Sequence, residues 1–563
     1  MTHHPASEGY FEVWIDSHTD FAVFLLLALG FVLRLWEAWG TFLNPDEALH
    51  FFIANQSSWA LAYKASLTMA HPPSLIFLLY VWRHVGTSDL VLRLPAILAG
   101  TAFCWVFFKW MNQLFGKSVA LTGLMLASLL PPLVLLSSEV RQYELLLLFA
   151  VTAAYFLEKA LAANSAGFML LASAFLCLSM LSHYSAFLFA AALGIYSLWR
   201  IVEAGTTTKV ALAWITGQAT ELGLAAVLYV THISRIKGTS MAEQAFDTWL
   251  RKSYFHSGAG NPLVFVVVRS FSVFQYFLGQ FFLGDIAAVI FIAGIVFLLR
   301  KRISLPKDGP TPLQISALLI LPFAFNCVAG LLDLYPYGGT RHSVFLAMFA
   351  IPGISLGLAG ITRKRQLRSC AIAAGIVLLC FLIPSRHPFI LRPDQNREHM
   401  EQAVRFVREQ IPPSSPLFVD YESAILLGHY LCQQRQVVYE SSAPGFLVFN
   451  CAGHRIISTT EVWGFTPQMF LRQWNDLVRN GTLHPGEIVW VGQAGWIVNL
   501  DDSLRKDLSE FRSLHSDIFG NNIRFFTITV GQPMPAVPLT GEAVTPAALA
   551  PIPALNPPAS ATI

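Results

Sequence analysis

Long apolar runs cover most of the first two thirds of the chain. They are found at 21–38, 89–109, 118–136, 143–161, 167–182, 183–200, 210–232, 285–300, 313–332, 342–360 and 368–384. A helix needs about 20 mostly apolar residues to cross a bilayer. The pattern therefore predicts an α-helical polytopic membrane protein with about eleven transmembrane helices.

Two further apolar stretches are predicted to lie on the membrane surface. Residues 72–85 make a run of only about 14 residues, a length typical of interfacial pieces. The run ends in Trp82, Arg83 and His84, residue types that suit the headgroup layer. Residues 263–283 are rich in Phe and Tyr. A surface helix there fits the charge pattern described next, and a further span is the alternative.

Basic residues gather in alternate short loops, near 109–117, at 159, at 200–209, at 300–307 and at 363–368. An excess of Lys and Arg in short loops marks the cytoplasmic side. With a cytoplasmic segment at 1–20 and eleven spans in a membrane domain at 21–384, all five loops fall inside. The first outer loop, 39–88, and everything after 384 then lie outside the cytoplasm, as in a protein of a bacterial inner membrane.

The membrane pattern is lost in residues 385–535. Helical segments at 402–410 and 424–432 alternate there with strand-like segments at 416–420, 487–491 and 524–530. This alternation predicts a small extracytoplasmic α/β domain. The tail at 536–563 is rich in Pro and Ala and is predicted to be disordered.

The composition agrees with a membrane protein and narrows its partners. Hydrophobic residues make up 55% and charged residues 13%, against about 25% charged in ordinary soluble proteins. The net charge, 37 − 34 = +3, is too small to indicate a nucleic-acid partner. No cleavable signal peptide is expected. Cys432 and Cys451 could pair if the C-terminal domain is extracytoplasmic, closing a loop worth ~3 kcal/mol; the sequence leaves this open.

Charged and imidazole side chains concentrate on the predicted outer side. The candidate catalytic residues are Asp46 and Glu47, the candidate phosphate-binding residues are His71, Arg141 and Arg341, and the supporting candidates are His50, Glu139, Tyr143, Tyr337 and His342. A carboxylate can remove the proton of an acceptor hydroxyl as a general base. Arginines neutralise a phosphate, best through paired hydrogen bonds. Transfer from a lipid phosphate needs this combination.

Each of these residues also has a structural interpretation. Asp46 and Glu47 follow Asn-Pro, a helix-start signal, and acidic residues there favour the helix dipole. His71 precedes Pro-Pro and could be a turn residue. Arg141 could pair with its neighbour Glu139, and Arg341 opens a span, where long basic side chains reach toward the headgroups. The functional interpretation is favoured because all of them fall on one side of the membrane.

Several motifs, in this order and spacing, resemble a known family. They are Asn44-Pro45-Asp46-Glu47-Ala48, His71-Pro72-Pro73, Gly86-Thr87-Ser88-Asp89 with Leu92-Arg93-Leu94-Pro95, Ser137-Ser138-Glu139-Val140-Arg141-Gln142-Tyr143 and Gly339-Thr340-Arg341-His342. Over about residues 20–385 the sequence resembles the polyprenyl-phosphate-sugar-dependent glycosyltransferases of the GT-C superfamily. That group includes protein O-mannosyltransferases and lipid A aminoarabinose transferases. No single motif is specific; the ordered set points to the superfamily and not to one subfamily.

The resemblance implies roles for individual residues. Asp46 occupies the position of the family's catalytic aspartate, and Glu47 that of its neighbour. His71 and Arg141 stand where relatives approach the donor phosphate. Arg341 corresponds to a late arginine assigned to the same phosphate. The family also has surface helices in its first outer loop, as predicted for residues 72–85.

Two features of the resemblance stay open. His342 follows Arg341 where the family has a tyrosine, so the assignment of Arg341 is the weakest of the set. Some relatives use a divalent metal ion and others do not. Asp46, Glu47, His50 and His71 could together hold one.

These observations lead to one functional hypothesis and three alternatives. The hypothesis is an integral-membrane, inverting glycosyltransferase that moves a sugar from a polyprenyl-phosphate donor to a hydroxyl of a lipid, glycan or protein on the extracytoplasmic face. The alternatives are a transporter or lipid flippase, a non-catalytic membrane subunit, and a transferase of whole oligosaccharides. Transporters usually carry repeated halves and charges near the midplane. Here the charges lie at span ends and no repeat is seen, which favours the enzyme.

Overall fold

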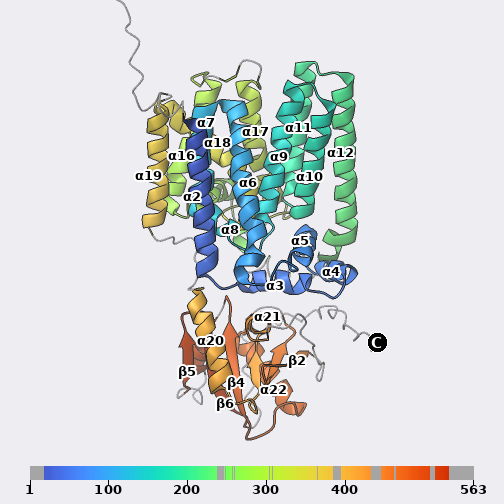
Figure 1. The fold of residues 1–563 in the computed structure, drawn as a ribbon, viewed down its shortest axis with the longest axis vertical. Helices are drawn as coiled ribbons and strands as arrows, with labels where there is room; N and C mark the ends of the chain where they lie inside the picture. Colours follow the sequence, from blue (N-terminus) through green and yellow to red (C-terminus); the bar gives the residue numbers. More distant parts are fainter. Residues whose placement is uncertain are drawn as a thin grey trace, which may run out of the picture.

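The computed structural model describes residues 18–531, apart from 237–245, 247–248, 257, 259, 304, 307–308, 364, 384–394, 433–444, 462–463, 497 and 508–513. Residues 1–17 of the predicted cytoplasmic segment, the predicted tail at 536–563 and the predicted domain boundary at 385 lie outside the described residues. A bundle of long helices forms one part of the molecule, and an α/β domain lies at one end of it. Short helices occupy the zone between the two (Figure 1).

The bundle contains thirteen helices among the described residues. They are α2 (Thr19–Gly40), α6 (Asp89–Phe115), α7 (Lys117–Leu129), α8 (Pro131–Ser137), α9 (Tyr143–Ala162), α10 (Ala166–Ser182), α11 (Ala186–Ala204), α12 (Thr208–Leu228), α15 (Pro262–Leu278), α16 (Phe281–Leu299), α17 (Pro312–Leu331), α18 (Ala347–Ile361) and α19 (Gln366–Leu382). A π turn at Tyr229–Ile233 joins α12 to α13 (Ser234–Ile236), and 3₁₀ turns lie at Arg251–Ser253 and Arg341–Leu346.

The polytopic fold class is confirmed, but the number of full-length spans is smaller than the sequence predicts. Within the described ranges, eight helices are long and apolar enough to cross a membrane, or nine if α7 and α8 form one bent span. All eleven predicted runs are helical, yet α10 and α19 have only 17 residues each. Between α7 and α8 the chain bends by 59°, because Leu130 is extended and Pro131 starts a new helix.

Small residues let two spans approach closely. A β-carbon on Gly294 of α16 would overlap the carbonyl of Gly353 in α18, and one on Gly357 would overlap the carbonyl of Ile290. Lipid tails offer no hydrophobic drive for helix association, so such close backbone contact is the usual means of packing in a bilayer. This contact helps to fix α18, which directly follows the turn that carries Arg341.

Three short helices lie at the end of the bundle nearest the α/β domain: α3 (Pro45–Ala54), α4 (Trp59–Ser66) and α5 (Ser74–Trp82) (Figure 1). With nine residues, α5 is too short to cross a bilayer, as the sequence predicts. Trp59 of α4 stacks on Phe77 of α5 with ring centroids 4.5 Å apart. Most of residues 263–283 form α15, an apolar helix of 17 residues. Its location on the membrane surface, with a span as the alternative, stays a prediction.

The C-terminal domain is a six-stranded sheet with helices packed on it. Its elements are α20 (Arg397–Gln410), β1 (Leu417–Val419), α21 (Tyr421–Tyr430), β2 (Phe446–Cys451), β3 (His454–Thr459), α22 (Pro467–Arg479), β4 (Ile488–Ala494), α23 (Leu500–Asp507), β5 (Ser516–Phe519) and β6 (Ile523–Thr529). The strand order is β2-β3-β1-β4-β6-β5. β1 is parallel to β3 and to β4, pairing Leu417 with Ile456 and with Trp490, while β2, β5 and β6 join antiparallel. The predicted α/β class is confirmed.

A side-chain network joins this domain to the membrane part. α21 packs on α3, with the Phe51 ring edge-on to His429 at 5.5 Å. His429 Nε2 lies 3.1 Å from Asp89 Oδ1, and the Tyr430 hydroxyl donates to Asp89 Oδ2 at 2.8 Å. The Leu43 amide donates to the same tyrosine oxygen at 2.6 Å. The start of α6 and the approach to α3 are therefore held by the last turn of α21.

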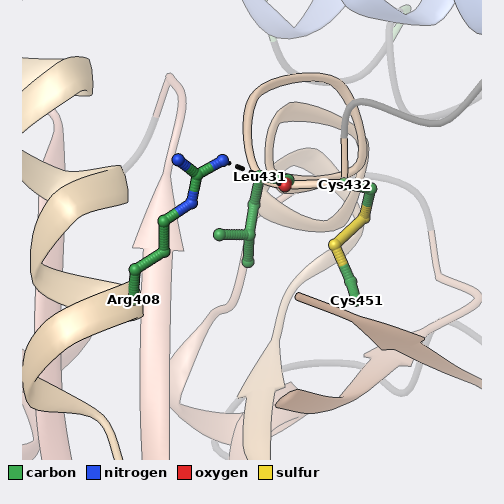
Figure 2. The surroundings of a disulfide bond; sticks show 4 residues. All are labelled: Arg408, Leu431, Cys432 and Cys451. Carbon is green, nitrogen blue, oxygen red and sulfur yellow. Dashed lines mark hydrogen bonds between the residues drawn. A yellow bond between two sulfur atoms is a disulfide. The ribbon is translucent and has the colours of Figure 1, made fainter. Parts of the chain in front are cut away.

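Cys432 and Cys451 form a disulfide, which closes the question that the sequence leaves open (Figure 2). Their Cα atoms are 5.1 Å apart and 19 residues apart in sequence. The bond ties the end of α21 to the last residue of β2. Beside it, Arg408 of α20 donates to the carbonyl of Leu431 at 3.4 Å.

Replacing both Cys432 and Cys451 with Ser is expected to destabilise the C-terminal domain by ~3 kcal/mol, because the unfolded chain regains the freedom of the closed loop. Thermal unfolding of the purified protein measures this. Adding reductant should lower the melting temperature of the wild type and leave that of the double variant unchanged. Equal melting temperatures for the two proteins without reductant would contradict the expectation.

Candidate functional site

The start of α3 is built by a local sequence signal. The Asn44 amide donates to Glu47 Oε2 at 2.9 Å, and the Glu47 amide donates to Asn44 Oδ1 at 2.9 Å. This reciprocal pair is a capping box, and Pro45 fills the first helical position, where its missing N–H costs nothing. Asp46 therefore sits in the first turn of α3 in a defined orientation.

Glu47, predicted as a catalytic residue, lies in a buried ion pair. Its side chain is 1% exposed. Arg93 holds both carboxylate oxygens, with Nε 2.8 Å from Oε1 and Nη2 2.7 Å from Oε2. The Val140 amide donates to Oε1 at 2.8 Å. Burial raises the pKa of Glu47, and Arg93 outweighs it and lowers that pKa. With its oxygens occupied, Glu47 anchors α3 to α6.

Asp46 is the point where distant parts of the chain meet. Its Oδ2 accepts from Arg141 Nη2 and, at 3.0 Å, from Arg341 Nη2. The Asp46 side chain remains 23% exposed, while Arg141 is 2% exposed. Burial alone raises the pKa of Asp46, but the two guanidinium groups hold it well below its ordinary value. Asp46 is thus an ionised carboxylate between two cations.

The two arginines come from turns at the ends of spans. Arg141 lies between α8 and α9, and its Nε is 3.7 Å from Glu139 Oε2. Arg341 opens the 3₁₀ turn before α18. That turn is anchored to α15 by the Gly339 amide, which donates to Ser272 Oγ at 2.9 Å. Gly338 has a φ of +133°, and a β-carbon at this position would lie 3.0 Å from the same serine oxygen. Glycine therefore lets the turn pack this closely against α15.

Four histidines form a stack beside this carboxylate. His50 lies over His71 with ring centroids 6.0 Å apart, His71 over His183 at 5.5 Å, and His183 beside His342 at 6.2 Å. Burial lowers the pKa of His50 to about 3 and that of His183 to about 3. Burial and then His183 lower the pKa of His71 well below its usual range. The stack is neutral at pH 7, so it offers hydrogen bonds without adding charge.

Many buried polar atoms around this stack have no hydrogen-bond partner among the described residues. They are both ring nitrogens of His50, Nδ1 of His71 and His342, the Tyr143 hydroxyl, the Gln142 side-chain amide and the Thr340 hydroxyl. Buried polar atoms are almost always paired, so a cluster of unpaired ones next to two arginines indicates a site for a polar ligand.

His183 and Tyr335 are site residues that the sequence analysis did not select. The Ser185 amide donates to His183 Nδ1 at 3.3 Å, which leaves the proton on Nε2. The Tyr335 ring lies 6.3 Å from His183. The signal that could have identified His183 is its position between two apolar runs, in the turn from α10 to α11.

Tyr337, predicted as a support residue, bonds to α15. Its hydroxyl shares a hydrogen bond with Ser270 Oγ of α15 at 2.7 Å. Two residues earlier, Tyr335 provides the aromatic ring at the site. The conformation of this irregular turn decides which of the two tyrosines faces the site, and the sequence pattern does not predict that conformation.

The four residues expected to hold a metal ion do not converge. Glu47 is bound by Arg93, Asp46 is bound by two guanidinium groups, and the rings of His50 and His71 are stacked. Across the described part of the chain, no group of three or more His, Cys, Asp or Glu is placed to hold a metal ion. No chemical step below uses one.

The family model for dolichyl-phosphate-mannose-protein mannosyltransferases matches residues 70–230. That range carries His71, Arg141 and His183 of the site just described. Over these residues, the chain is similar to that family of glycosyltransferases. The matched range lies within the part of the chain whose motifs resemble the GT-C superfamily.

Solved structures with similar folds were also found. ArnT from Cupriavidus metallidurans bound to undecaprenyl phosphate has 13% identity and a TM-score of 0.48, covering 90% of this chain and 97% of that one. The Archaeoglobus fulgidus oligosaccharyltransferase with Zn and sulfate has 14% identity and a TM-score of 0.43, covering 72% of this chain and 61% of that one. Archaeoglobus fulgidus AglB with an inhibitory peptide and a dolichol-phosphate has 10% identity and a TM-score of 0.40, covering 73% and 64%. Among curated proteins, no match was found.

In the structure, most of the predicted site residues fall into two groups. Asp46, Arg141 and Arg341 meet, with Glu139 at the edge. His50, His71, Tyr143 and His342 form the adjoining stack together with His183. Glu47 and Tyr337 serve the scaffold instead.

Proposed function

We propose that this protein transfers a sugar from a polyprenyl-phosphate carrier to a hydroxyl group by inversion at the sugar's anomeric carbon. The observation that carries the proposal is Asp46 held between Arg141 and Arg341 at the membrane boundary. Asp46 beside two guanidinium groups, with Glu139 at the edge, provides one base and one site for a phosphate. Undecaprenyl phosphate and dolichol phosphate, named with two of the similar structures, belong to this lipid class.

In the proposed reaction Asp46 takes the proton of the acceptor hydroxyl. The acceptor oxygen forms a bond to the anomeric carbon as the bond from that carbon to the phosphate oxygen breaks. The leaving group is the polyprenyl phosphate, whose added negative charge is neutralised by Arg141 and Arg341. Transfer in one displacement uses one carboxylate and inverts the configuration, and Glu47 is not free to act as a second one.

Donor binding is expected to make Asp46 a stronger base. In the structure both guanidinium groups are engaged by Asp46, and the pKa of that carboxyl, which burial alone would raise, is held low by them. A carboxylate with a very low pKa is a weak base. A phosphate that binds the same arginines weakens their hold on Asp46 and raises its basicity. Donor binding should therefore precede productive acceptor binding.

The neutral histidine stack fits the remainder of the donor. Its unpaired ring nitrogens, together with the Tyr143 and Thr340 hydroxyls, can bind sugar hydroxyls or phosphate oxygens. His71 and His183 would thus add hydrogen bonds to those of the arginines. Because they are uncharged, they leave the two arginines as the main source of positive charge at the site.

We place the site and the C-terminal domain on the extracytoplasmic face. Basic residues gather in the loops at the other end of the spans. The disulfide between Cys432 and Cys451 supports the placement, since such bonds persist in oxidising compartments such as a periplasm.

The proposal is tested with the purified protein in liposomes that contain labelled polyprenyl-phosphate-linked hexoses or pentoses, mixed with extracts of native membranes as the acceptor source. Release of polyprenyl phosphate together with a labelled product of inverted configuration is expected for at least one donor. Retained configuration would contradict inversion. Donor transport across the liposome without bond cleavage would instead support the flippase alternative.

Arg141→Ala is expected to raise the donor KM by ~10-fold or more, because a hydrogen bond between charged groups is worth ~1.5–3 kcal/mol. Arg141→Lys keeps the charge but loses the planar fork and should recover only part of the affinity. Initial rates at varied donor concentration measure both. Arg397→Ala, on an exposed part of α20, serves as the control. An unchanged donor KM in Arg141→Ala would remove that arginine from the phosphate site.

A further inference from the structure

The edge of the C-terminal sheet at the carboxyl ends of its parallel strands faces the membrane part. β1, β3 and β4 are parallel, and β1 lies between the other two. From β1 the chain moves to β3 on one side and then returns to β4 on the other. In open α/β sheets, ligands bind outside the carboxyl ends of strands at such a reversal. Asp420 directly follows β1 there, and Gly495 directly follows β4.

This edge touches the helix that carries Asp46. Gly495 has φ of +144°, and a β-carbon on it would lie 2.5 Å from Glu422 Oε2 and 3.0 Å from Pro45 Cγ. Only glycine gives the backbone room for that approach. The loop after β4 therefore lies against both the carboxyl of Glu422, in the first turn of α21, and the first turn of α3. Asp46 follows Pro45 directly.

Glu422 is a buried carboxyl that no cation neutralises. It is 6% exposed, and its Oε2 accepts from the Trp496 amide at 3.0 Å. Among the described residues, its Oε1 has no hydrogen-bond partner and no Lys or Arg forms an ion pair with it. Glu47, which is equally buried, differs in having Arg93 on both oxygens. A buried acid without a cation stays neutral and can donate a hydrogen bond.

The surroundings of Glu422 favour this neutral form. Burial raises its pKa to about 8, and the charges of Asp420 and Asp46 add to the rise, while the Trp496 amide opposes it. Asp420 faces it from the same helix start, Asp46 from α3, and the Trp496 amide from the loop after β4. The group is therefore protonated at pH 7 and becomes ionised above about pH 8.

We propose that Glu422 of the C-terminal domain is a neutral hydrogen-bond donor that binds the acceptor beside Asp46, so that this domain completes the catalytic site. The inference rests on the proposed function. Arg141 and Arg341 reach Asp46 from the membrane part, where the lipid donor must lie. From the C-terminal domain, Gly495 lies against both Glu422 and Pro45. The acceptor class that fits is an uncharged polyol, one of whose hydroxyls meets Asp46 while a neighbouring one meets Glu422.

The choice of variants separates this role from a structural one. In Glu422→Gln, the amide oxygen can still accept from the Trp496 amide and the NH2 group can still donate, but the side chain cannot ionise. Glu422→Ala removes both functions. Glu409→Gln, at an exposed position on α20 of the same domain, is the matched control.

Transfer is measured from pH 6 to pH 9.5 with the donor that the wild type uses and native membranes as acceptor source. The wild type should lose about 10-fold between pH 7 and pH 9, since one pH unit above its pKa leaves a tenth of an acid neutral. Glu422→Gln should keep transfer within about threefold at pH 7 and lose that decline. Glu422→Ala should lose about 10-fold or more at pH 7, while polyprenyl phosphate stabilises it against heat as much as the wild type.

Two outcomes would overturn the inference: the same alkaline decline in Glu422→Gln as in the wild type, or wild-type transfer by Glu422→Ala. An active wild type with either outcome leaves the proposed function intact and removes only the role of Glu422. A wild type that uses no polyprenyl-phosphate donor would count against the proposed function itself, and with it against this inference.

Discussion

Asp46→Asn is expected to lower the rate of sugar transfer by ~10³-fold. The amide cannot accept the acceptor's proton, and general bases contribute ~10²–10⁴-fold to the reactions they assist. The variant should fold, because asparagine has the same shape and Asp46 is partly exposed at the start of α3. Initial rates at saturating donor measure the loss. Asp20→Asn, an exposed carboxylate at the start of α2, is the control.

The same variant should bind the donor as well as the wild type does, or more tightly. In the wild type the donor phosphate must displace Asp46 from Arg141 and Arg341, and asparagine competes less for these cations because it carries no charge. Stabilisation by polyprenyl phosphate in a thermal unfolding assay reports this. Loss of transfer together with loss of donor binding would show that Asp46 organises the site instead of acting as its base. Near-normal transfer would end the proposed mechanism.

Arg93→Ala is expected to have the largest effect on stability, about 3–5 kcal/mol, because it leaves the buried Glu47 carboxylate without its counter-charge. Arg93 also donates to the carbonyls of Ala38, Thr41 and Phe42 at 2.8–2.9 Å, and these would lose their partner. Thermal unfolding in detergent and the yield of folded protein measure the effect.

A second substitution tests the cause of that loss. Arg93→Met combined with Glu47→Leu removes both charges and should be more stable than Arg93→Ala, since a buried ion pair replaced by apolar residues is often nearly neutral. Arg472→Ala breaks an exposed ion pair with Glu461 and should cost only ~0–1 kcal/mol. A double variant as unstable as Arg93→Ala would show that the lost carbonyl contacts dominate.

Local patterns were sufficient for much of this protein. Runs of about 20 apolar residues leave few alternatives to a membrane helix, because the bilayer accepts little else. Asn44-Pro45 with an acid at position 47 specifies a helix start through contacts within four residues. The strands at Leu417–Val419, Ile488–Ala494 and Ile523–Thr529 follow from short apolar runs between turns. Asp46, Arg141 and Arg341 were found because all lie at span ends on one side.

Other assignments needed contacts between segments far apart in the chain. The ion pair of Glu47 could not be predicted locally, because its partner, Arg93, lies 46 residues away inside α6. Tyr337 and Tyr335 are alike in sequence, and only the turn before Arg341 decides which ring meets His183.

By itself, the sequence determined the membrane class and the α/β domain and predicted a site of one acid and two arginines, because each depends on residue type and local spacing. The tertiary structure decided how each carboxylate is paired, because Arg93 holds the buried Glu47 while Arg141 and Arg341 hold the partly exposed Asp46. It also brought Glu422 of the second domain to the start of α3. The reason is physical: a charge becomes a base, an anchor or a neutral acid according to the groups that surround it, and those come from distant parts of the chain.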